Sequence, residues 1–524
     1  MATLRERVRT FLRKLPWARF GAGAIAGGAG LLVTFILRSY GLGVFLPEVA
    51  VDFAVEHIPG AVESFFIRTL GEGGKALALL TAIAVFLALP GIYATFFRRV
   101  QRRIKNRWLV MAFYTFTSSA IVLFGILPLL NPRFLGSSPA SFGFAALGQL
   151  LGFWIYAALL DYFFIDVSAR YPQGFSLSRR QFLIGSFAAI AFTVLAAYGI
   201  ASLAAKKGRL AFASIQEMLS KEITPISEFY IVTKNLNDPS VNLESWRLQV
   251  SGMVANPGTY SYADLASRAD PSSPDAADEI VTLECVSNEV GGNLISTARW
   301  NGIRLAAILG AAGLDPASDW IVFHCADDYT AAIPRDRALD PDTMIALYMT
   351  DDPLANPKDS PLRREHGSPA RIIVPGLYGM FHAKWLMGIE ATRGEYAGYW
   401  QQKGWTNRGQ IRTTAIIATP ADGTVVRGPV TLGGIAFAGD RGISAVEVGV
   451  SSEGQISWSA ATLKSPKSSL TWVLWTFEWM PPHVGSFRIF VRSVDGASMP
   501  QESGTASPFP DGSAGYDSIT LLVP

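Results

Sequence analysis

The sequence predicts a multi-domain protein with an N-terminal α-helical bundle, a central α+β domain and a C-terminal all-β sandwich. Long apolar stretches are concentrated before residue 205. After Ile223 they give way to short alternating strands with turn residues, and after Pro420 only strand patterns of period two remain. We therefore place three domains at residues 1–205, 206–420 and 421–524.

Composition limits the classes of protein that need to be considered. At 524 residues, 50% of them hydrophobic, the chain has room for several domains and a membrane portion. A net charge of +3 is too small to favour nucleic acid as a partner. Two cysteines exclude a disulfide-dense scaffold and a four-thiolate zinc site, although Cys285 and Cys325 could still form one bridge.

The N-terminal domain is predicted to be a membrane anchor of about five transmembrane helices. A bilayer core of about 30 Å requires about 20 apolar residues in a helix. Five stretches approach that length, and the first is short and rich in glycine and alanine, which suits close helix packing. They are residues 21–37, 76–97, 108–130, 144–165 and 182–204.

Loop charges predict the orientation of the anchor. Basic residues cluster at 5–19 and 98–107, whereas the loop after the first stretch carries Glu48, Asp52 and Glu56. The positive-inside rule places the N-terminus in the cytoplasm. Five spans of the cytoplasmic membrane then leave everything after about residue 205 on the outer, periplasmic face.

Residues 178–183, SRRQFL, precede the last apolar stretch and look like an internal twin-arginine export motif. The alternative is an arginine pair that anchors a helix at the membrane interface. The residues alone favour neither interpretation.

The anchor itself is not expected to carry electrons or solutes. Of five histidines only His57 lies before residue 300, and it falls in a predicted loop, so the bundle has no pair of axial haem ligands. Charged residues lie at the edges of the apolar stretches, which argues against a transporter. The bundle is interpreted as an anchor and a docking surface for another membrane protein.

Residues 366–390, HGSPARIIVPGLYGMFHAKWLMGIE, hold the densest group of candidate ligand-binding residues. His366, Arg371, His382 and Lys384 border a short β-branched strand and its glycine-containing bends. Glycine lets backbone N–H groups approach a ligand, and arginine forks onto anions, so the pattern predicts an anionic ligand. The alternative is a strand pair with solvated charges at its edge.

Cys285 ends a predicted strand, VTLEC. A single cysteine is more often a small buried hydrophobe than a ligand. A thiolate at the end of a strand, however, projects from a rigid base into loops, which suits a soft or high-valent metal centre. Asn288 and two glycines follow it, and then Trp300, Gly302 and Leu305.

These motifs, in the order CxxN, WxGxxL and HGxPxR…PGxxG…KW, resemble the molybdopterin domain of the sulfite oxidase family. The resemblance runs from about Pro225 to the C-terminus. It implies a molybdenum–molybdopterin cofactor with Cys285 as the metal ligand, and it implies that backbone near Gly379 cups the pterin phosphate. The residues expected to bind the cofactor are Lys234, Asn235, Asn288, His366, Arg371, Gly379, His382 and Lys384.

Two departures from the family pattern bear on the substrate. Glu289 stands where sulfite-oxidising members of the family have an arginine, and Trp405 stands where they have a tyrosine. A carboxylate there would repel a dianion, so a sulfoxide or an N-oxide is favoured over sulfite. Together with Cys285, these two residues are the predicted catalytic set.

Other residues near these motifs have structural as well as functional interpretations. Cys325 is expected in the core, while His324 either faces the site or packs. Asp327, Asp328 and Tyr329 end a predicted strand and either form a solvated turn, which is favoured, or line the substrate cleft. The C-terminal domain is predicted to be immunoglobulin-like, and its counterpart in the family serves dimerisation, so a homodimer is compatible with the sequence.

The sequence therefore predicts a membrane-anchored molybdopterin oxidoreductase that performs two-electron oxygen-atom transfer. No haem or flavin motif occurs, so electrons are expected to pass to or from a separate cytochrome or quinone-linked membrane protein. The alternative is a non-catalytic binding or assembly protein that retains a relic pterin fold.

Overall fold

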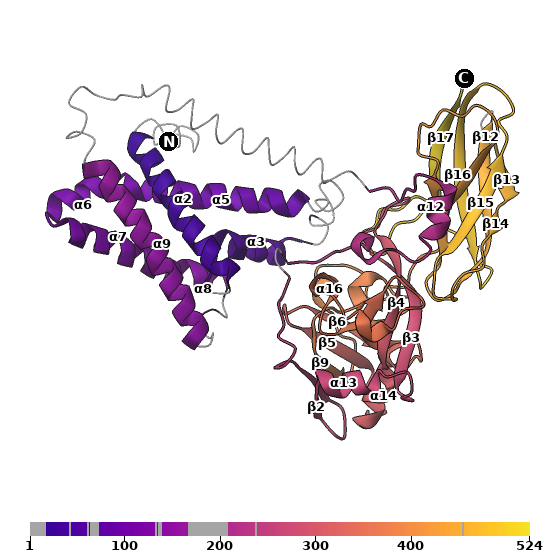
Figure 1. Ribbon diagram of the computed structural model, residues 1–524, viewed down its shortest axis with the longest axis horizontal. Coiled ribbons are helices and arrows are strands. Elements are labelled where there is room, and N and C mark those ends of the chain that lie inside the picture. The colour runs from indigo at the N-terminus through magenta and orange to yellow at the C-terminus, as the bar shows by residue number, and fades with distance from the viewer. Residues whose placement is uncertain are drawn as a thin grey trace. The chain divides into compact units, whose positions relative to one another are not determined.

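The computed structural model describes residues 17–40, 43–59, 62, 73–131, 134, 139–165, 208–235, 238–452 and 455–524 (Figure 1). They fall into two compact units, one holding the helices before residue 166 and the other the residues from 208 onward. Each unit is described by itself.

Where the structure describes the first unit, its regular elements are all helices. Its helices are α2 (Trp17–Ser39), α3 (Leu46–His57), α5 (Gly73–Ala94), α6 (Phe97–Arg103), α7 (Arg107–Ile121), the π-helix η1 (Val122–Ile126), α8 (Leu127–Leu130) and α9 (Pro139–Ile165). Helix α2 packs against both α5 and α9. A Cβ atom on Gly30 of α2 would lie 2.7 Å from the carbonyl oxygen of Gly152 on α9, so glycine allows the two backbones to approach.

Among the described residues, four helical stretches are long and apolar enough to cross a membrane: Arg19–Arg38, Leu77–Arg103, Arg107–Leu130 and Phe142–Phe163. They correspond to four of the five predicted spans. The fifth, at residues 182–204, and the arginine pair of residues 178–183 lie outside the described residues. One buried acid, Asp161 near the end of α9, pairs with Arg107 at the start of α7 at 3.2 Å.

The central part of the second unit is built on two sheets. One has the order β2-β1-β9-β5-β6, in which β1 and β9 run parallel, and the other has the antiparallel order β3-β4-β7-β8. The strands are β1 (Arg247–Gly252), β2 (Gly258–Ser261), β3 (Ala276–Glu284), β4 (Ile295–Arg304), β5 (Trp320–Cys325), β6 (Thr330–Pro334), β7 (Met344–Thr350), β8 (Arg371–Ile373) and β9 (Leu386–Thr392).

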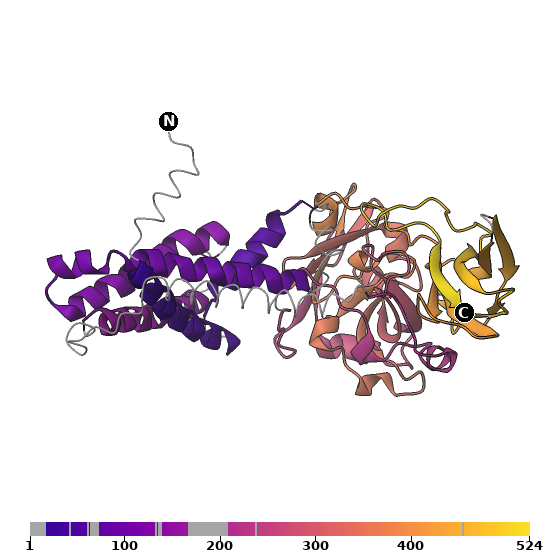
Figure 2. The same cartoon turned by 90° about the horizontal axis from the view of Figure 1, so that it is seen from above.

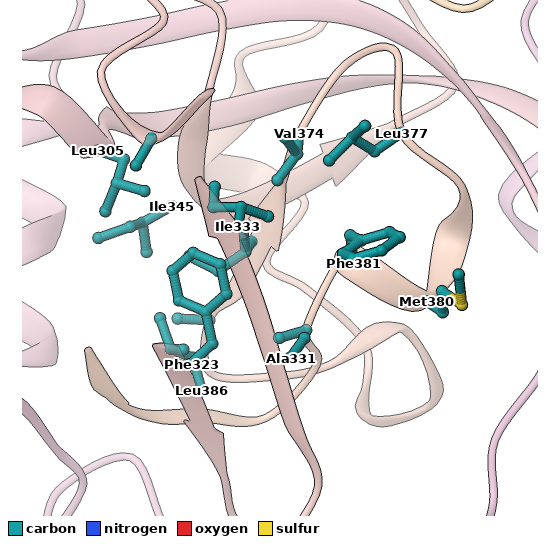
Figure 3. Packing of buried hydrophobic residues seen from close by; sticks show 14 of the residues in the cluster. Leu305, Phe323, Ala331, Ile333, Ile345, Val374, Leu377, Met380, Phe381 and Leu386 are labelled. Atoms are coloured by element: carbon teal, nitrogen blue, oxygen red, sulfur yellow. The ribbon is translucent and has the colours of Figure 1, made fainter. Parts of the chain in front are cut away.

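Short helices join these strands, and one core lies between the sheets. The helices are α12 (Ile215–Ser220), η3 (Ile226–Glu228), α13 (Tyr262–Arg268), α14 (Leu305–Ala311), α15 (Arg335–Ala338), η4 (Pro357–Asp359), η5 (Arg364–His366), η6 (Gly379–Phe381) and α16 (Tyr399–Gln402). Phe323 of β5 and Ile333 of β6 meet Ile345 of β7 in this core, as Figure 3 shows. Phe381 extends the core to the loop after β8, so the loops that carry the candidate site rest on packed side chains.

The C-terminal strands form two antiparallel four-stranded sheets, β10-β11-β15-β14 and β13-β12-β16-β17. Buried residues of both sheets, including Ile417 and Ile489, share one cluster, so the sheets form a sandwich beside the central strands (Figure 2). The strands are β10 (Thr414–Thr419), β11 (Val430–Phe437), β12 (Ile443–Ser452), β13 (Gln455–Ala460), β14 (Thr462–Leu463), β15 (Val473–Trp479), β16 (Gly485–Asp495) and β17 (Asp517–Val523).

Contacts join the sandwich to the central sheets. The Trp472 indole donates a hydrogen bond to the Glu222 carbonyl oxygen, and the Thr282 amide of β3 donates to the Leu470 carbonyl oxygen. Ile416 and Phe437 of the sandwich strands belong to the same buried cluster as the central core. The sandwich can therefore influence loops of the central part.

Candidate active site

A cavity opens among the loops of the central part and encloses about 910 Å³ of empty space, counting its mouth. Its walls come from residues 229–234, the loop after β3, the turn between β5 and β6, and the loops around β8. Its chemically active lining residues are Tyr230, Lys234, Cys285, Ser287, Asp327, Tyr329, His366, Arg371, His382, Lys384, Trp400 and Trp405. Loops far apart in the sequence thus bring most of the predicted site residues together.

Cys285 is the first residue after β3 and is buried in the wall of this cavity. Its amide donates to the Leu294 carbonyl oxygen, which ties it to the start of β4. Its Sγ lies 3.0 Å from the Ser287 hydroxyl. Burial raises the pKa of the Cys285 thiol, so a thiolate here needs a nearby cation such as a metal ion.

Asn288 and Glu289, which come shortly after Cys285 and were predicted to lie in the site, do not line the cavity. Asn288 is buried behind Cys285, where its Nδ2 donates to Glu284 Oε1 and its Oδ1 accepts from the Leu294 amide, each at 3.0 Å. These bonds fix the shape of the cysteine loop. Glu289 is exposed and does not line the cavity.

Arg371, at the start of β8, is 6% exposed and lines the cavity. Its Nη1 donates to the His366 carbonyl oxygen at 3.1 Å, and its Nη2 donates to the His382 carbonyl oxygen at 3.3 Å. Its guanidinium lies 5.0 Å from the centre of the Trp300 ring.

Within the described residues, no carboxylate forms an ion pair with Arg371 and its Nε has no hydrogen-bond partner. Burial lowers the pKa of the Arg371 guanidinium to about 10. An uncompensated buried cation is costly, and an anionic occupant of the cavity would remove that cost.

The two histidines of this region differ in what their rings can do. His366 is 2% exposed, and its Nε2 has no partner among the described residues. Burial and then the Arg371 charge lower its pKa to about 4, so it is neutral at physiological pH. His382 instead accepts from the Val374 amide at Nδ1 and donates to the Leu377 carbonyl oxygen from Nε2. Both ring nitrogens of His382 are therefore hydrogen-bonded, and they hold the bend at Pro375 and Gly376 in place.

Lysines approach the cavity from two sides. Lys384 Nζ donates to the Glu365 carbonyl oxygen at 3.1 Å and lies 4.4 Å from the Trp385 ring centre. Lys234 Nζ lies 3.9 Å from Asp327 Oδ2, an oxygen that also accepts from Asn235 Nδ2 at 2.9 Å. Asn235 itself is not a lining residue.

The turn after β5 is part of the wall. Asp327 and Tyr329 line the cavity, and the Tyr329 hydroxyl donates to the Met380 carbonyl oxygen. The expectation of a solvated turn is wrong for these two residues because the turn packs against the loop at 379–381. Nearby, His324 Nε2 lies 2.8 Å from Glu390 Oε2 on a half-exposed part of β5 and β9, and Cys325 is buried.

Tyr230 is a lining residue that sequence reasoning missed. A Cβ atom on Gly379 would lie 2.6 Å from the Tyr230 hydroxyl oxygen and 3.7 Å from Cα of Cys285. Glycine at 379 therefore lets this hydroxyl and the cysteine loop come together. An aromatic residue in the apolar run FYIV carries no signal of its own, so nothing in the sequence distinguished Tyr230 from a core residue.

Trp405 also lines the cavity, with 5% of its surface exposed. Its indole Nε1 has no acceptor among the described residues. Three lining residues, His366, Arg371 and Trp405, thus each have a buried nitrogen without a partner. Buried polar groups are normally satisfied, so the cavity has the character of a site for a polar, anionic occupant. With a thiol in the same wall, the donors fit a metal centre carried on an anionic organic chelate.

Comparisons with known proteins agree with this chemistry. Residues 235–400 match the family model described as the oxidoreductase molybdopterin binding domain. Human mitochondrial sulfite oxidase is 28% identical over 324 residues, which cover 53% of this chain and 57% of the relative. The uncharacterized oxidoreductase YuiH of Bacillus subtilis is 29% identical over 168 residues, or 32% of this chain and 76% of that protein.

The chain thus spans little more than half the length of the human and mouse sulfite oxidases. Among solved structures, the sulfane dehydrogenase SoxCD from Paracoccus pantotrophus covers 55% of this chain and 78% of its own, with 18% identity and a TM-score of 0.46. That likeness is too slight to support an argument about function.

The cavity and the matched segment together define a molybdopterin-binding oxidoreductase domain. Within that class, the similarity to the sulfite oxidases supports the predicted sulfite oxidase family and an oxidoreductase enzyme. The implied cofactor is a molybdenum–molybdopterin.

Proposed function

We propose that this chain is a membrane-anchored molybdenum oxidoreductase that exchanges an oxygen atom with a small, neutral substrate. One observation carries the proposal: Arg371 is a buried cation without a carboxylate partner in the described residues, in the same cavity as the Cys285 thiol. An anionic metal–pterin complex satisfies both groups at once.

Different residues are proposed to hold different parts of the cofactor. Cys285 supplies the thiolate ligand of the metal. Arg371, His366 and Lys384 line the cavity and would hold the anionic pterin, and Lys234 would assist them, with Asn235 bound to the same Asp327 oxygen that Lys234 approaches. When bound, the cofactor supplies two-electron oxygen-atom transfer, while the protein binds, orients and shields the reacting groups.

The remaining residues of the wall position these groups. Asn288 holds the loop that carries Cys285, and His382 holds the bend that directly precedes Gly379. The two carbonyl oxygens bound by Arg371 hold its guanidinium in one orientation. Rigid support of this kind is what a pre-organised site requires.

The uncharged part of the cavity favours a sulfoxide or an N-oxide as the substrate. Because Glu289 lies outside the cavity wall, its charge is not the argument for this preference. The lining residues Met380, Trp400 and Trp405 instead offer apolar surface and a neutral N–H donor. Such a wall does not compensate the desolvation of a dianion such as sulfite.

Four long apolar helices in the described part of the chain support anchoring in a membrane. From the loop charges we propose that this is the cytoplasmic membrane, with the N-terminus inside and the catalytic domain on the outer face. The sandwich is proposed to be an immunoglobulin-like domain suited to homodimerisation. The electron partner is proposed to be a separate cytochrome or a quinone-linked membrane protein.

Metal analysis of the full chain, purified in detergent, tests the proposal. We expect about one molybdenum per chain and dye-driven reduction of dimethyl sulfoxide or trimethylamine N-oxide. Cys285→Ser should abolish turnover, while Cys325→Ser, a buried thiol that is not a lining residue, should retain it. A metal-free protein would contradict the enzyme and favour the non-catalytic alternative.

A further inference from the structure

We propose that the Trp405 indole N–H donates a hydrogen bond to the oxygen atom of the substrate, and that Phe509 of the C-terminal sandwich sets the position of this indole. The inference rests on the proposed function and identifies the group that recognises its substrate. It also makes the C-terminal sandwich part of the active site.

The first observation is the state of Trp405. Its side chain lines the same cavity as Cys285, is 95% buried and has an indole N–H without an acceptor among the described residues. A buried N–H that makes no hydrogen bond costs about 1–3 kcal/mol. Because no described residue accepts this N–H, a molecule bound in the cavity is the available source of an acceptor.

The second observation is how Trp405 is held. The Trp405 amide donates to the Trp400 carbonyl oxygen at 3.1 Å, which closes the turn after α16. The indole packs edge-on against the ring of Phe509, with 5.1 Å between ring centres and 78° between planes. Phe509 lies in the loop between β16 and β17 of the sandwich.

Further contacts attach this loop to the central part. The Thr406 amide donates to the Pro510 carbonyl oxygen at 3.1 Å. A Cβ atom on Gly512 would lie 2.2 Å from the Tyr378 hydroxyl oxygen, so the loop backbone lies directly against that residue. Tyr378 in turn accepts a hydrogen bond from the Arg412 amide at 3.1 Å. These contacts hold the sandwich loop against the central part directly after Phe509.

The chemistry of the wall identifies the substrate class. A neutral N–H beside aromatic and thioether surface suits a compact, uncharged molecule with a strongly accepting oxygen, as in a sulfoxide or an N-oxide. In the overall reaction, the S–O or N–O bond breaks and the substrate gains two electrons. Two protons and the released oxygen form water, and an external one-electron donor supplies the electrons.

Steady-state kinetics of the molybdenum-loaded full chain test this inference, with reduced viologen as the donor and dimethyl sulfoxide or trimethylamine N-oxide as the substrate. Trp405→Phe keeps the ring and removes the N–H. We expect KM to rise about tenfold, as for one lost hydrogen bond, with molybdenum content unchanged and kcat within about twofold.

Phe509→Leu should raise KM in the same direction by a smaller factor, because the indole would lose its edge contact. Phe477→Leu, at a partly buried position of β15 in the sandwich core, is the matched control and should leave KM unchanged. A merely structural role of Phe509 would lower the yield of active enzyme and hence kcat without changing KM.

The outcomes separate the two proposals. An active wild-type enzyme whose KM stays within twofold in Trp405→Phe overturns the recognition role and leaves the proposed function standing. A wild-type chain that binds molybdenum but reduces neither oxide overturns the proposed substrate class and this inference with it. Equal effects of Phe509→Leu and Phe477→Leu overturn the positioning role.

Discussion

Arg371→Met is predicted to affect the cofactor-free and cofactor-loaded proteins differently. In the folded chain, burial lowers the pKa of this guanidinium from its ordinary value to about 10. At about 1.4 kcal/mol per pKa unit, the charged form is disfavoured by about 3 kcal/mol relative to the unfolded chain. Removing the charge removes this cost from the cofactor-free protein.

The substitution also has costs of its own. Two hydrogen bonds to the carbonyl oxygens of His366 and His382 disappear, each worth about 1 kcal/mol, and so does the contact with the Trp300 ring, worth about 1 kcal/mol. The net change in the free energy of unfolding of the cofactor-free protein is therefore near zero. The loaded protein loses a charge-assisted bond to the pterin, about 2–3 kcal/mol of cofactor binding.

Thermal unfolding of both forms, alongside molybdenum content, measures these changes. Arg441→Met is the matched control, because Arg441 pairs at 2.8 Å with the buried Asp495 in the sandwich. It should destabilise both forms equally, by leaving a buried carboxylate unpaired. If Arg371→Met destabilised the cofactor-free protein as much as Arg441→Met does, the interpretation of Arg371 as an uncompensated cation would be refuted.

Three further predictions follow from single contacts. His382 is neutral in the fold, with its pKa lowered to about 3, so its contribution to the free energy of unfolding should be constant above about pH 6.5 and should be lost as the pH drops from there toward 3. The fall over that range should therefore be smaller in His382→Gln than in wild type, and an equal fall in both would contradict this. Gly379→Ala should destabilise the protein by about 1–3 kcal/mol and lower its molybdenum content, and Tyr230→Phe should partly restore both, since the added Cβ collides with the Tyr230 hydroxyl; absence of rescue would count against that contact. Gly30→Val should lower the melting temperature in detergent by separating α2 from α9, whereas Gly125→Ala, with open space around it, should not; equal shifts would exclude this packing.

Local sequence patterns were enough to predict much of the fold and the residues around Cys285 and Arg371 that are proposed to bind the cofactor. Four of the five predicted apolar stretches match long helices, since helix length and hydropathy are local properties of the chain. The cysteine at a strand end and the cation-rich segment around Arg371 carry local signals too, because both motifs place their side chains by strand ends and glycine turns. Gly367, with φ +107°, makes the turn that its position after His366 predicts.

The sequence did not correctly place residues whose role depends on contacts with distant loops. Asn288 and Glu289 follow the cysteine in the motif. Hydrogen bonds nevertheless hold Asn288 behind the loop, and Glu289 is exposed. Tyr230 and Tyr329 have no motif, and they line the cavity only because their loops pack against residues 379–381.

By itself, the sequence determined the kinds of chemistry present: apolar helices, a thiol at a strand end, and cations beside glycine bends. The tertiary structure alone decided which of those groups share a cavity, and it added the contact between Trp405 and the sandwich loop at Phe509. The reason is physical: hydropathy and backbone preference act over a few residues, whereas this cavity wall is defined by packing between segments far apart in the chain, such as Tyr329 and Met380.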